Sequence, residues 1–192
     1  MTGISEAPQP GTFLQTVEMA VVGIDEMSNV RHLHASSARR LAAGLLSEAE
    51  ITAFTQHIYS EPYSARIAEI VLASRLAAAR LGGELVGTAG WIPTNDSGAI
   101  ARLIGVFVSP LYSRKGIGRV LVTTAEAQAR QAGFRTFTIR APLSASRFFE
   151  QLGYDVASHG VWPLSRDIAL PVAFLRKADP ATAPIQLRPV RK

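Results

Sequence analysis

The sequence contains no cysteine. Disulfide bonds, thiolate zinc sites and a cysteinyl nucleophile are therefore excluded. The sequence also lacks any apolar run close to the roughly 18 residues that indicate a membrane-spanning helix. Residues 1–15 have neither a basic start nor an apolar stretch, so no signal peptide is predicted. These absences predict a cytoplasmic protein that does not contact a membrane.

Acidic side chains are in deficit, with 15 Asp and Glu against 20 Lys and Arg, a net charge of +5 and a pI near 10.1. A basic balance of this kind can indicate a nucleic-acid partner. Here the basic residues do not form a helix face interleaved with aromatic rings. Several lie in one internal loop, and others end the chain at Arg188, Arg191 and Lys192. We therefore expect no nucleic-acid partner, and the role of the basic tail stays open.

What is present indicates one domain with a substantial core, because the chain has 192 residues of which 47% are hydrophobic. We expect a loose leader over residues 1–15, a domain over residues 16–178, and a flexible basic tail over residues 179–192. The tail is rich in proline, and no internal repeat is found.

Apolar periodicity and turn residues predict helices and strands throughout the domain. Ser47 and Glu50 have capping-box spacing, and Gly82-Gly83 predicts a hairpin turn. The last two strands should form an antiparallel pair linked by a loop around Trp162, Pro163 and Asp167. The expected strands are Val17–Val22, Arg75–Leu81, Glu84–Ile92, Ile100–Val108, Phe134–Ala141, Tyr154–Ser158 and Ala169–Lys177; the expected helices are Asp25–Gly44, 47–57, Glu61–Leu72, 117–132 and Ser144–Leu152.

The stretch from Leu103 to Gly133 reads as a buried strand, a loop broken by Pro110, and an amphipathic helix. Glycine inside a buried strand marks a bulge or a close approach, so Gly105 predicts that the strand is irregular before Val108. The hydrogen-bond ladder between this strand and its neighbour is expected to be interrupted just before Val108.

Two glycines, Gly116 and Gly118, stand at the start of this helix, although each costs about 1 kcal/mol against alanine in a helix interior. Glycine lets the unpaired N–H groups of a first turn approach a phosphate, and the helix dipole favours the negative charge. Arg114, Lys115 and Arg119 add positive charge. We interpret the loop as a pyrophosphate cradle, while an ordinary crossover whose glycines permit tight packing is about as probable on the spacing alone.

Two commoner phosphate loops are excluded. The Walker pattern requires Gly-Lys followed by Ser or Thr, and Gly116 is followed by Ile117. The dinucleotide fingerprint requires a third glycine where Leu121 stands. A less common cradle remains.

The run from Val108 to Leu121 resembles the acetyl-CoA loop of the GNAT superfamily of N-acetyltransferases. The block from Ala145 to Tyr154 resembles the last helix and following strand of that family. Order and spacing agree over about residues 19–177. Where the family has Arg or Gln three residues before the first glycine, this chain has Ser113.

The resemblance implies an α/β (α+β) fold: a GNAT-like single domain with a mixed, mostly antiparallel sheet of about six to seven strands, flanked by helices and splayed between the fourth and fifth strands. It implies acetyl-CoA as cosubstrate and no metal. The Val108 amide would donate to the developing oxyanion, and the backbone of Phe107 and Val108 would pair with the pantetheine arm. The cofactor-binding residues implied are Val106, Phe107, Val108, Ser113, Arg114, Lys115, Gly116, Ile117, Gly118, Arg119 and Phe149.

The proton donor of the family has no counterpart here. Phe149 stands where many members place a tyrosine that protonates the thiolate, and Pro142 stands where asparagine is frequent. A thiol has a pKa near 8.5, so a thiolate can leave without help at neutral pH. Ser146, Tyr112 or water could replace the tyrosine.

A general base and the acceptor contacts are also open. The strand Ile100–Val108 has no carboxylate, so an amine proton could pass through water to Glu84, Glu61 or His57. His32 and His34 would point about 200° apart on a helix and form no metal pair. The four histidines are expected to be packed or surface residues. By resemblance, Tyr59, Tyr63 and Arg66 are candidate acceptor contacts, though packing roles are more common for such residues.

Three functions follow. The first is an N-acetyltransferase that moves an acetyl group from acetyl-CoA to a primary amine of a small molecule or peptide by direct attack in a ternary complex. The second is a catalytically impaired CoA-binding module with a regulatory or sensing role. The third is a basic nucleic-acid binder. A homodimer is left open.

Overall fold

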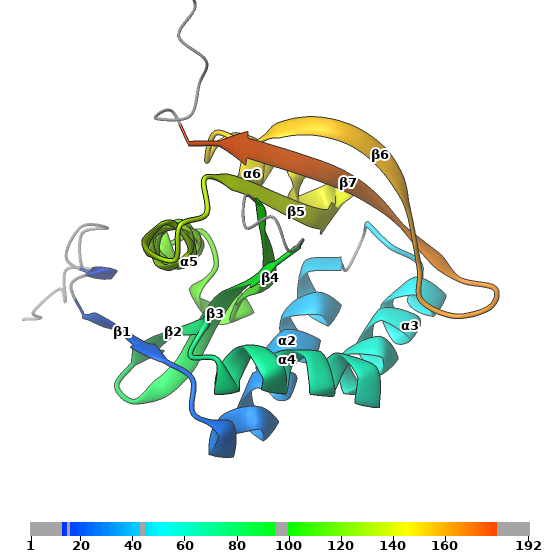
Figure 1. The fold of residues 1–192 in the computed structure, drawn as a ribbon. Coiled ribbons are helices and arrows are strands. Elements are labelled where there is room, and N and C mark those ends of the chain that lie inside the picture. The colour runs from blue at the N-terminus through cyan, green and yellow to red at the C-terminus, as the bar shows by residue number, and fades with distance from the viewer. Residues whose placement is uncertain (1–12, 15, 43–44, 95–99, 180–192) are drawn as a thin grey trace, which may run out of the picture.

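The computed structural model describes residues 13–14, 16–42, 45–94 and 100–179. A seven-stranded sheet with the order β1-β2-β3-β4-β5-β7-β6 forms the centre of the fold, with helices on both faces (Figure 1). Neighbouring strands are antiparallel except β4 and β5, which are parallel. The mixed, mostly antiparallel sheet is confirmed. The strands are β1 (Val17–Val21), β2 (Leu76–Leu81), β3 (Glu84–Pro93), β4 (Ile100–Val108), β5 (Thr136–Pro142), β6 (Asp155–Pro163) and β7 (Ala169–Ala178).

Two of the helices begin at serine caps that the sequence provides. The Ser47 hydroxyl accepts from the Glu50 N–H while the Glu50 carboxylate accepts from the Ser47 N–H, which completes the predicted capping box. Ser60 caps the next helix, which has Pro62 in its first turn. The helices are α2 (Met27–Ala42), α3 (Glu48–Tyr59), α4 (Glu61–Leu72), α5 (Ile117–Gln131) and α6 (Ser146–Glu150), with short 3-10 turns at Ile24–Glu26, Pro110–Tyr112 and Leu143–Ala145.

Two apolar clusters cover opposite faces of the sheet. One cluster packs α5 and α6 against the sheet and includes Leu121, Phe137 and Phe149. The other packs α2, α3 and α4 and includes Ile67 and Leu76. The alternation of side chains along each strand explains the division, because neighbouring residues project to opposite faces.

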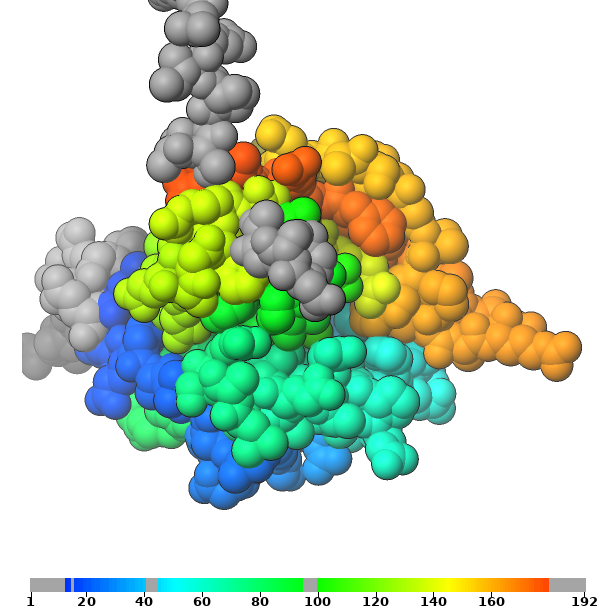
Figure 2. Space-filling view, viewed as in Figure 1, coloured from blue at the N-terminus to red at the C-terminus, as the bar shows by residue number. Residues whose placement is uncertain are grey.

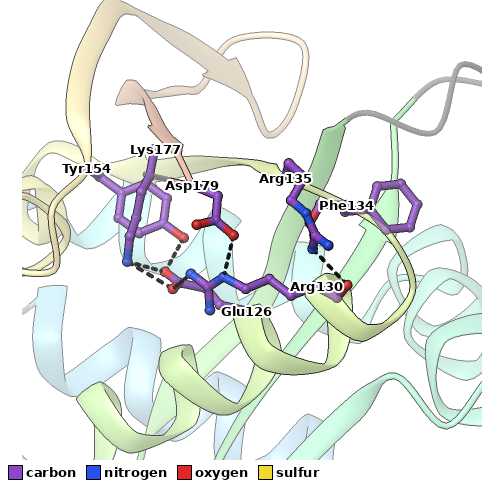
Figure 3. A network of polar contacts seen from close by, with 7 residues as sticks. All are labelled: Glu126, Arg130, Phe134, Arg135, Tyr154, Lys177 and Asp179. Atoms are coloured by element: carbon purple, nitrogen blue, oxygen red, sulfur yellow. Dashed lines mark hydrogen bonds and ion pairs between the residues drawn. The ribbon is translucent and has the colours of Figure 1, made fainter. Parts of the chain in front are cut away.

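A buried carboxylate ties α5 to the far end of the sheet (Figure 3). Glu126 is only 3% exposed. Its oxygens lie 2.9 Å from Lys177 Nζ and accept from the Tyr154 hydroxyl and from Arg130, one turn along the helix. Arg130 also pairs with Asp179 at the end of β7. The charge of Glu126 is thus paired inside the fold, as buried charges require.

Two predictions of element bounds were wrong. Trp162 and Pro163 were expected in a loop, but β6 continues through both, and Trp162 pairs with Leu170. Trp162 packs edge-on against Phe54 of α3, which accounts for the longer strand. Pro163 stands at the strand end, where a missing N–H is tolerated. In Figure 2 the turn between β6 and β7 projects well beyond the body of the molecule.

The predicted helix Ser144–Leu152 is shorter in the structure. A 3-10 turn over Leu143–Ala145 comes first, and α6 ends at Glu150. Among the described residues, no helix is long and apolar enough to cross a membrane. The predicted leader over residues 1–15 and the predicted tail over residues 179–192 lie largely outside the described residues.

Candidate active site

The register of β4 shifts at Gly105, which has φ +65°. Thr88 pairs with Phe107 and Gly90 with Ile104, so β4 carries one residue more than β3 between these pairs. The predicted bulge is confirmed. The Thr88 hydroxyl donates to the Gly105 carbonyl oxygen at 2.7 Å and fixes the bulge in place.

β4 separates from β5 before the chain reaches this bulge. The two parallel strands are paired only from Ile100 with Thr136 to Arg102 with Thr138. A cavity of about 380 Å³ lies where they part, lined by residues 102–107 of β4 and 139–142 of β5. Its lining includes Phe149 from the cluster of α5 and α6, and Phe54 and Tyr63 from the cluster of α2, α3 and α4. The cavity therefore reaches both faces of the sheet.

The N–H group of Val108 points away from β3, toward the side of β4 on which β5 lies earlier in the strand. Ser109 donates its N–H to Val86 of β3 at 2.8 Å. Because successive N–H groups along a strand point to opposite edges, the Val108 N–H points away from β3. The Val108 carbonyl faces the same way and accepts from Ser37 of α2 at 2.9 Å. A backbone donor is thus presented at the edge that β5 has left.

The loop between β4 and α5 has the backbone of an anion site. Arg114 has φ +64° and Gly116 has φ +87°, both in the left-handed region. The first turn of α5 begins at Ile117, and the Val120 N–H donates to the Gly116 carbonyl. The N–H groups before Val120 belong to the unpaired first turn, where helix geometry offers no backbone acceptor.

The glycines of this loop have little free space beside their Cα atoms. A Cβ on Gly118 would lie 3.1 Å from the Phe148 ring, and one on Gly116 would lie 3.2 Å from Leu14. Lys115 stands over the rings of Phe13 and Tyr112. Bare amides with adjacent cations suit the phosphates of a coenzyme. The residues present therefore fit acetyl-CoA at this loop.

A buried hydrogen-bond chain reaches the cavity wall at Tyr63. The Tyr63 hydroxyl lies 2.8 Å from His34 Nδ1, and His34 Nε2 lies 2.8 Å from the Thr88 hydroxyl. Thr88 gives its proton to Gly105, so it accepts from His34 Nε2–H. Burial lowers the pKa of His34 to about 3, so the ring is neutral and Nδ1 accepts from Tyr63. The free lone pair of Tyr63 is then available only as an acceptor.

A second histidine lies in the cavity wall. His57 of α3 packs edge-on against Tyr63 and Trp162, at ring-centroid distances of 5.5 and 4.8 Å. Burial, and then the positive charge of Arg140, lower the pKa of His57 below its usual value of 6.5. The imidazole is neutral at pH 7 and able to accept a proton.

Three arginines complete the lining: Arg66, Arg102 and Arg140. The Arg140 guanidinium stacks on the Trp162 ring, with Cζ 4.1 Å from the ring centroid. Burial, and then the charge of Arg102, lower the pKa of Arg140. The cavity thus has a positive wall on the face of α2, α3 and α4.

The sequence profile of the acetyltransferase (GNAT) family matches residues 43–154, which is more than half of the chain. The chain belongs to this family. It is therefore an acyltransferase, and acetyl-CoA is its acyl donor. The comparison with curated proteins returns no significant match.

Solved structures of acetyltransferases share the fold. A GCN5-related N-acetyltransferase from Rhodopseudomonas palustris superposes with a TM-score of 0.72 at 20% identity, covering 85% of this chain and 96% of the other. The PaiA N-acetyltransferase from Thermoplasma acidophilum, in complex with coenzyme A, superposes with a TM-score of 0.66 at 18% identity, covering 84% of this chain and 98% of the other. YncA from Salmonella typhimurium, a proposed acetyltransferase with its cofactor acetyl-CoA, superposes with a TM-score of 0.59 at 16% identity, covering 84% of this chain and 93% of the other.

Two of the three predicted acceptor contacts of this acetyltransferase line the cavity. Tyr63 and Arg66 line the cavity, whereas Tyr59 is 50% exposed at the end of α3 and does not line it. Among the three predicted proton acceptors only His57 lines the cavity; Glu61 and Glu84 are exposed elsewhere. Their roles stay predictions.

The predicted coenzyme contacts are divided, because Val108 and residues 113–119 of the loop do not line the cavity. Val106, Phe107 and Phe149 line the cavity, and Phe149 is buried. The side-chain oxygen of Ser146 is buried and has no hydrogen-bond partner in the described part of the chain, and Ser146 does not line the cavity. The Ser113 hydroxyl donates to the Pro110 carbonyl at 2.9 Å, and the Ser113 N–H donates to the same oxygen at 3.4 Å.

Sequence reasoning missed three features of this acetyltransferase: the chain through His34, the Arg102 and Arg140 pair, and the place of Trp162 in the wall. A signal for Arg102 was present, because it is the one charged residue within the apolar strand 100–108. The His34 chain joins α2, α4 and β3, which no local pattern relates.

Proposed function

We propose that this acetyltransferase transfers the acetyl group of acetyl-CoA directly to a primary amine of a small molecule or peptide, with both substrates bound at once. One observation carries the proposal: a single cavity reaches both faces of the sheet at the point where β4 and β5 part. The coenzyme would enter from the α5 side, beside the loop amides. The amine would enter from the side of α2, α3 and α4.

The chain supplies binding and orientation through its backbone. The N–H groups of residues 113–119 would hold the pyrophosphate, and Lys115 and Arg119 would add charge. The edges of Phe107 and Val108 would align the pantetheine arm. When bound, acetyl-CoA supplies an activated thioester carbonyl. The Val108 N–H would stabilise the negative charge that develops on the carbonyl oxygen, a contribution of several kcal/mol in comparable sites, about 2.7–4 for one such donor.

The nucleophile must lose a proton, and His57 is the group in the cavity that can take it. Its neutral imidazole at pH 7 follows from burial and from the charge of Arg140. The Tyr63 oxygen would hold the amine by accepting one of its N–H groups, since its own proton is given to His34. The proton reaches His57 directly or through a water molecule.

The leaving thiolate has no side-chain acid in the described lining of the cavity. Phe149 has no proton to give, and Tyr63 donates its proton to His34. A thiol pKa near 8.5 makes a thiolate an acceptable leaving group at neutral pH. We therefore propose that solvent protonates the thiolate after it leaves.

The alternative is a catalytically impaired CoA-binding module. Phe149 at the usual tyrosine position favours it. A neutral histidine and a phenol oxygen that open into the same cavity favour catalysis instead. A cytoplasmic location and a homodimer stay predictions.

Two measurements test the proposal. Calorimetry with acetyl-CoA should show binding at a single site, and release of free thiol should follow when primary amines are added. Binding without thiol release from any amine would favour the impaired module. Absence of binding would contradict both functions.

A further inference from the structure

The wall of the cavity on the face of α2, α3 and α4 is positively charged and lacks acid. Its charged members are Arg66 of α4, Arg102 of β4 and Arg140 of β5. No aspartate or glutamate occurs among the described residues that line the cavity. A substrate whose only charges are ammonium groups would therefore meet repulsion here.

Arg102 and Arg140 have no anionic partner within the described ranges. The ion pairs found there involve other cations, and no hydrogen bond from either guanidinium is found. Arg66 differs, because it pairs with Glu69 at the surface. A guanidinium has five donors in a planar fork. The guanidinium of Arg140 stacks on Trp162, and the residue is exposed, so its donors are accessible to a ligand.

The two arginines stand where an acceptor substrate would need them. Arg102 is at the last paired position of β4 with β5, and Arg140 lies two residues beyond its partner Thr138, so both stand where the strands begin to part. They alternate with Leu103, Ile139 and Ala141, which pack on the α5 side. His57 and Tyr63 line the same cavity, and the charge of Arg140 acts on His57.

We propose that the acceptor is a small primary amine that carries a carboxylate, and that Arg140, with Arg102 beside it, binds this carboxylate. The guanidinium fork matches a planar carboxylate in a two-bond arrangement, which also fixes orientation. The carboxylate neutralises two neighbouring cations, and its amine lies toward the Tyr63 oxygen and His57. The cavity of about 380 Å³ must also admit the acetylated end of the coenzyme, which restricts the acceptor to a small molecule. This proposal rests on the acetyl transfer proposed above.

The test compares matched acceptors and matched variants. Free-thiol release is measured with amino acids, with the corresponding amino-acid amides, with aminoalkyl phosphates and with polyamines. The wild-type kcat/KM should be at least about tenfold higher for an acid than for its amide, because an uncharged amide leaves the charged donors without their partner. Arg140→Gln should reduce this ratio toward one, mainly through KM. Arg166→Gln removes the same charge from the exposed β6–β7 turn and should leave the ratio unchanged.

Equal rates for acids and amides, a preference for phosphates or polyamines, or an unchanged ratio in Arg140→Gln would overturn the carboxylate assignment while acetyl transfer stands. If no amine leads to thiol release, calorimetry with a set of N-acetyl amino acids in the presence of coenzyme A tests the carboxylate site separately from the transfer activity. Binding to the wild type that is lost in Arg140→Gln would support the carboxylate site although the transfer activity fails. No binding of any of them would reject the site as well.

Discussion

The hydroxyl of Tyr63 lies 2.8 Å from Nδ1 of His34, and the proton between them belongs to the tyrosine. The assignment follows from the far end of the chain, where Thr88 donates to the Gly105 carbonyl and can only accept from His34. A backbone bulge in β4 therefore sets which way a phenol on α4 presents its lone pair. The Tyr63 hydroxyl in the cavity wall and the irregular strand are parts of one hydrogen-bonded unit.

Replacing Tyr63 by phenylalanine tests this unit. The variant leaves His34 Nδ1 without a partner in the core, which should lower the free energy of unfolding by about 1–3 kcal/mol. It should also raise KM for the amine, because the acceptor oxygen is gone. Thermal unfolding and steady-state rates measure the two effects. Tyr59→Phe makes the same change on an exposed side chain outside the cavity and should do neither.

The pH dependence of turnover should identify His57. Its pKa is lowered by burial and by Arg140, so the imidazole stays neutral, and kcat stays high, below pH 6.5. Activity should fall only as pH drops through the depressed pKa. Arg140→Gln removes a nearby positive charge, which makes protonation easier and should move the acidic limb of kcat at saturating acceptor to higher pH.

Two histidine variants provide the control for this profile. His57→Gln should lower kcat by about 10²–10⁴, the range typical of a lost general base. His159→Gln on the exposed edge of β6 should leave kcat and its profile unchanged. An acidic limb that is the same in wild type and Arg140→Gln would assign the base to another group.

The Glu126 network should contribute to stability and not to chemistry. Glu126→Gln leaves Lys177 and Arg130 without the carboxylate between them, which should cost about 1–3 kcal/mol, less than for a fully buried pair because both cations are partly exposed. Denaturant unfolding measures this loss, while KM for acetyl-CoA should be unchanged. Glu150→Gln on the exposed side of α6 is the matched control.

The loop amides can be tested at Gly118. Gly118→Glu places a carboxylate where the phosphates should lie, so calorimetry should show no binding of acetyl-CoA. Gly118→Ala adds only a Cβ against the Phe148 ring, which can shift by a few tenths of an ångström, and should retain measurable binding. Circular dichroism should be the same for both. Equal affinity of the two variants would show that the loop does not hold the coenzyme.

Local patterns were sufficient for much of the fold, because capping residues, turn glycines and apolar periodicity act over a few neighbours. The start of α3 at Ser47 and the turn at Gly82-Gly83 are examples. The bulge at Gly105 was predictable for the same reason, since only a special backbone or a close approach places glycine in such a strand.

The proposed acceptor site depends on contacts between distant elements, and the sequence predicted only part of it. Tyr63, Arg66 and His57 were candidates, whereas Arg102, Arg140 and Trp162 were not. Trp162 looked like a loop residue because the strand that holds it is stabilised by packing on α3. The pKa of His57 is lowered first by burial and then by the charge of Arg140, which is 83 residues away in sequence and on another element. Tyr59 and Tyr63 are the same residue type four positions apart, so the sequence does not distinguish their roles. The orientation of α3 and α4 leaves the Tyr59 ring exposed and places the Tyr63 ring in the cavity wall.

A crystal structure with coenzyme A bound tests the central claim most directly. The account predicts the pyrophosphate on the amides of residues 113–119, the pantetheine arm along Phe107 and Val108, and the sulfur in the cavity between β4 and β5 on the side of the Val108 N–H. Coenzyme bound elsewhere, or an opening filled by the side chains of Phe148 and Phe149 with the coenzyme outside, would contradict it.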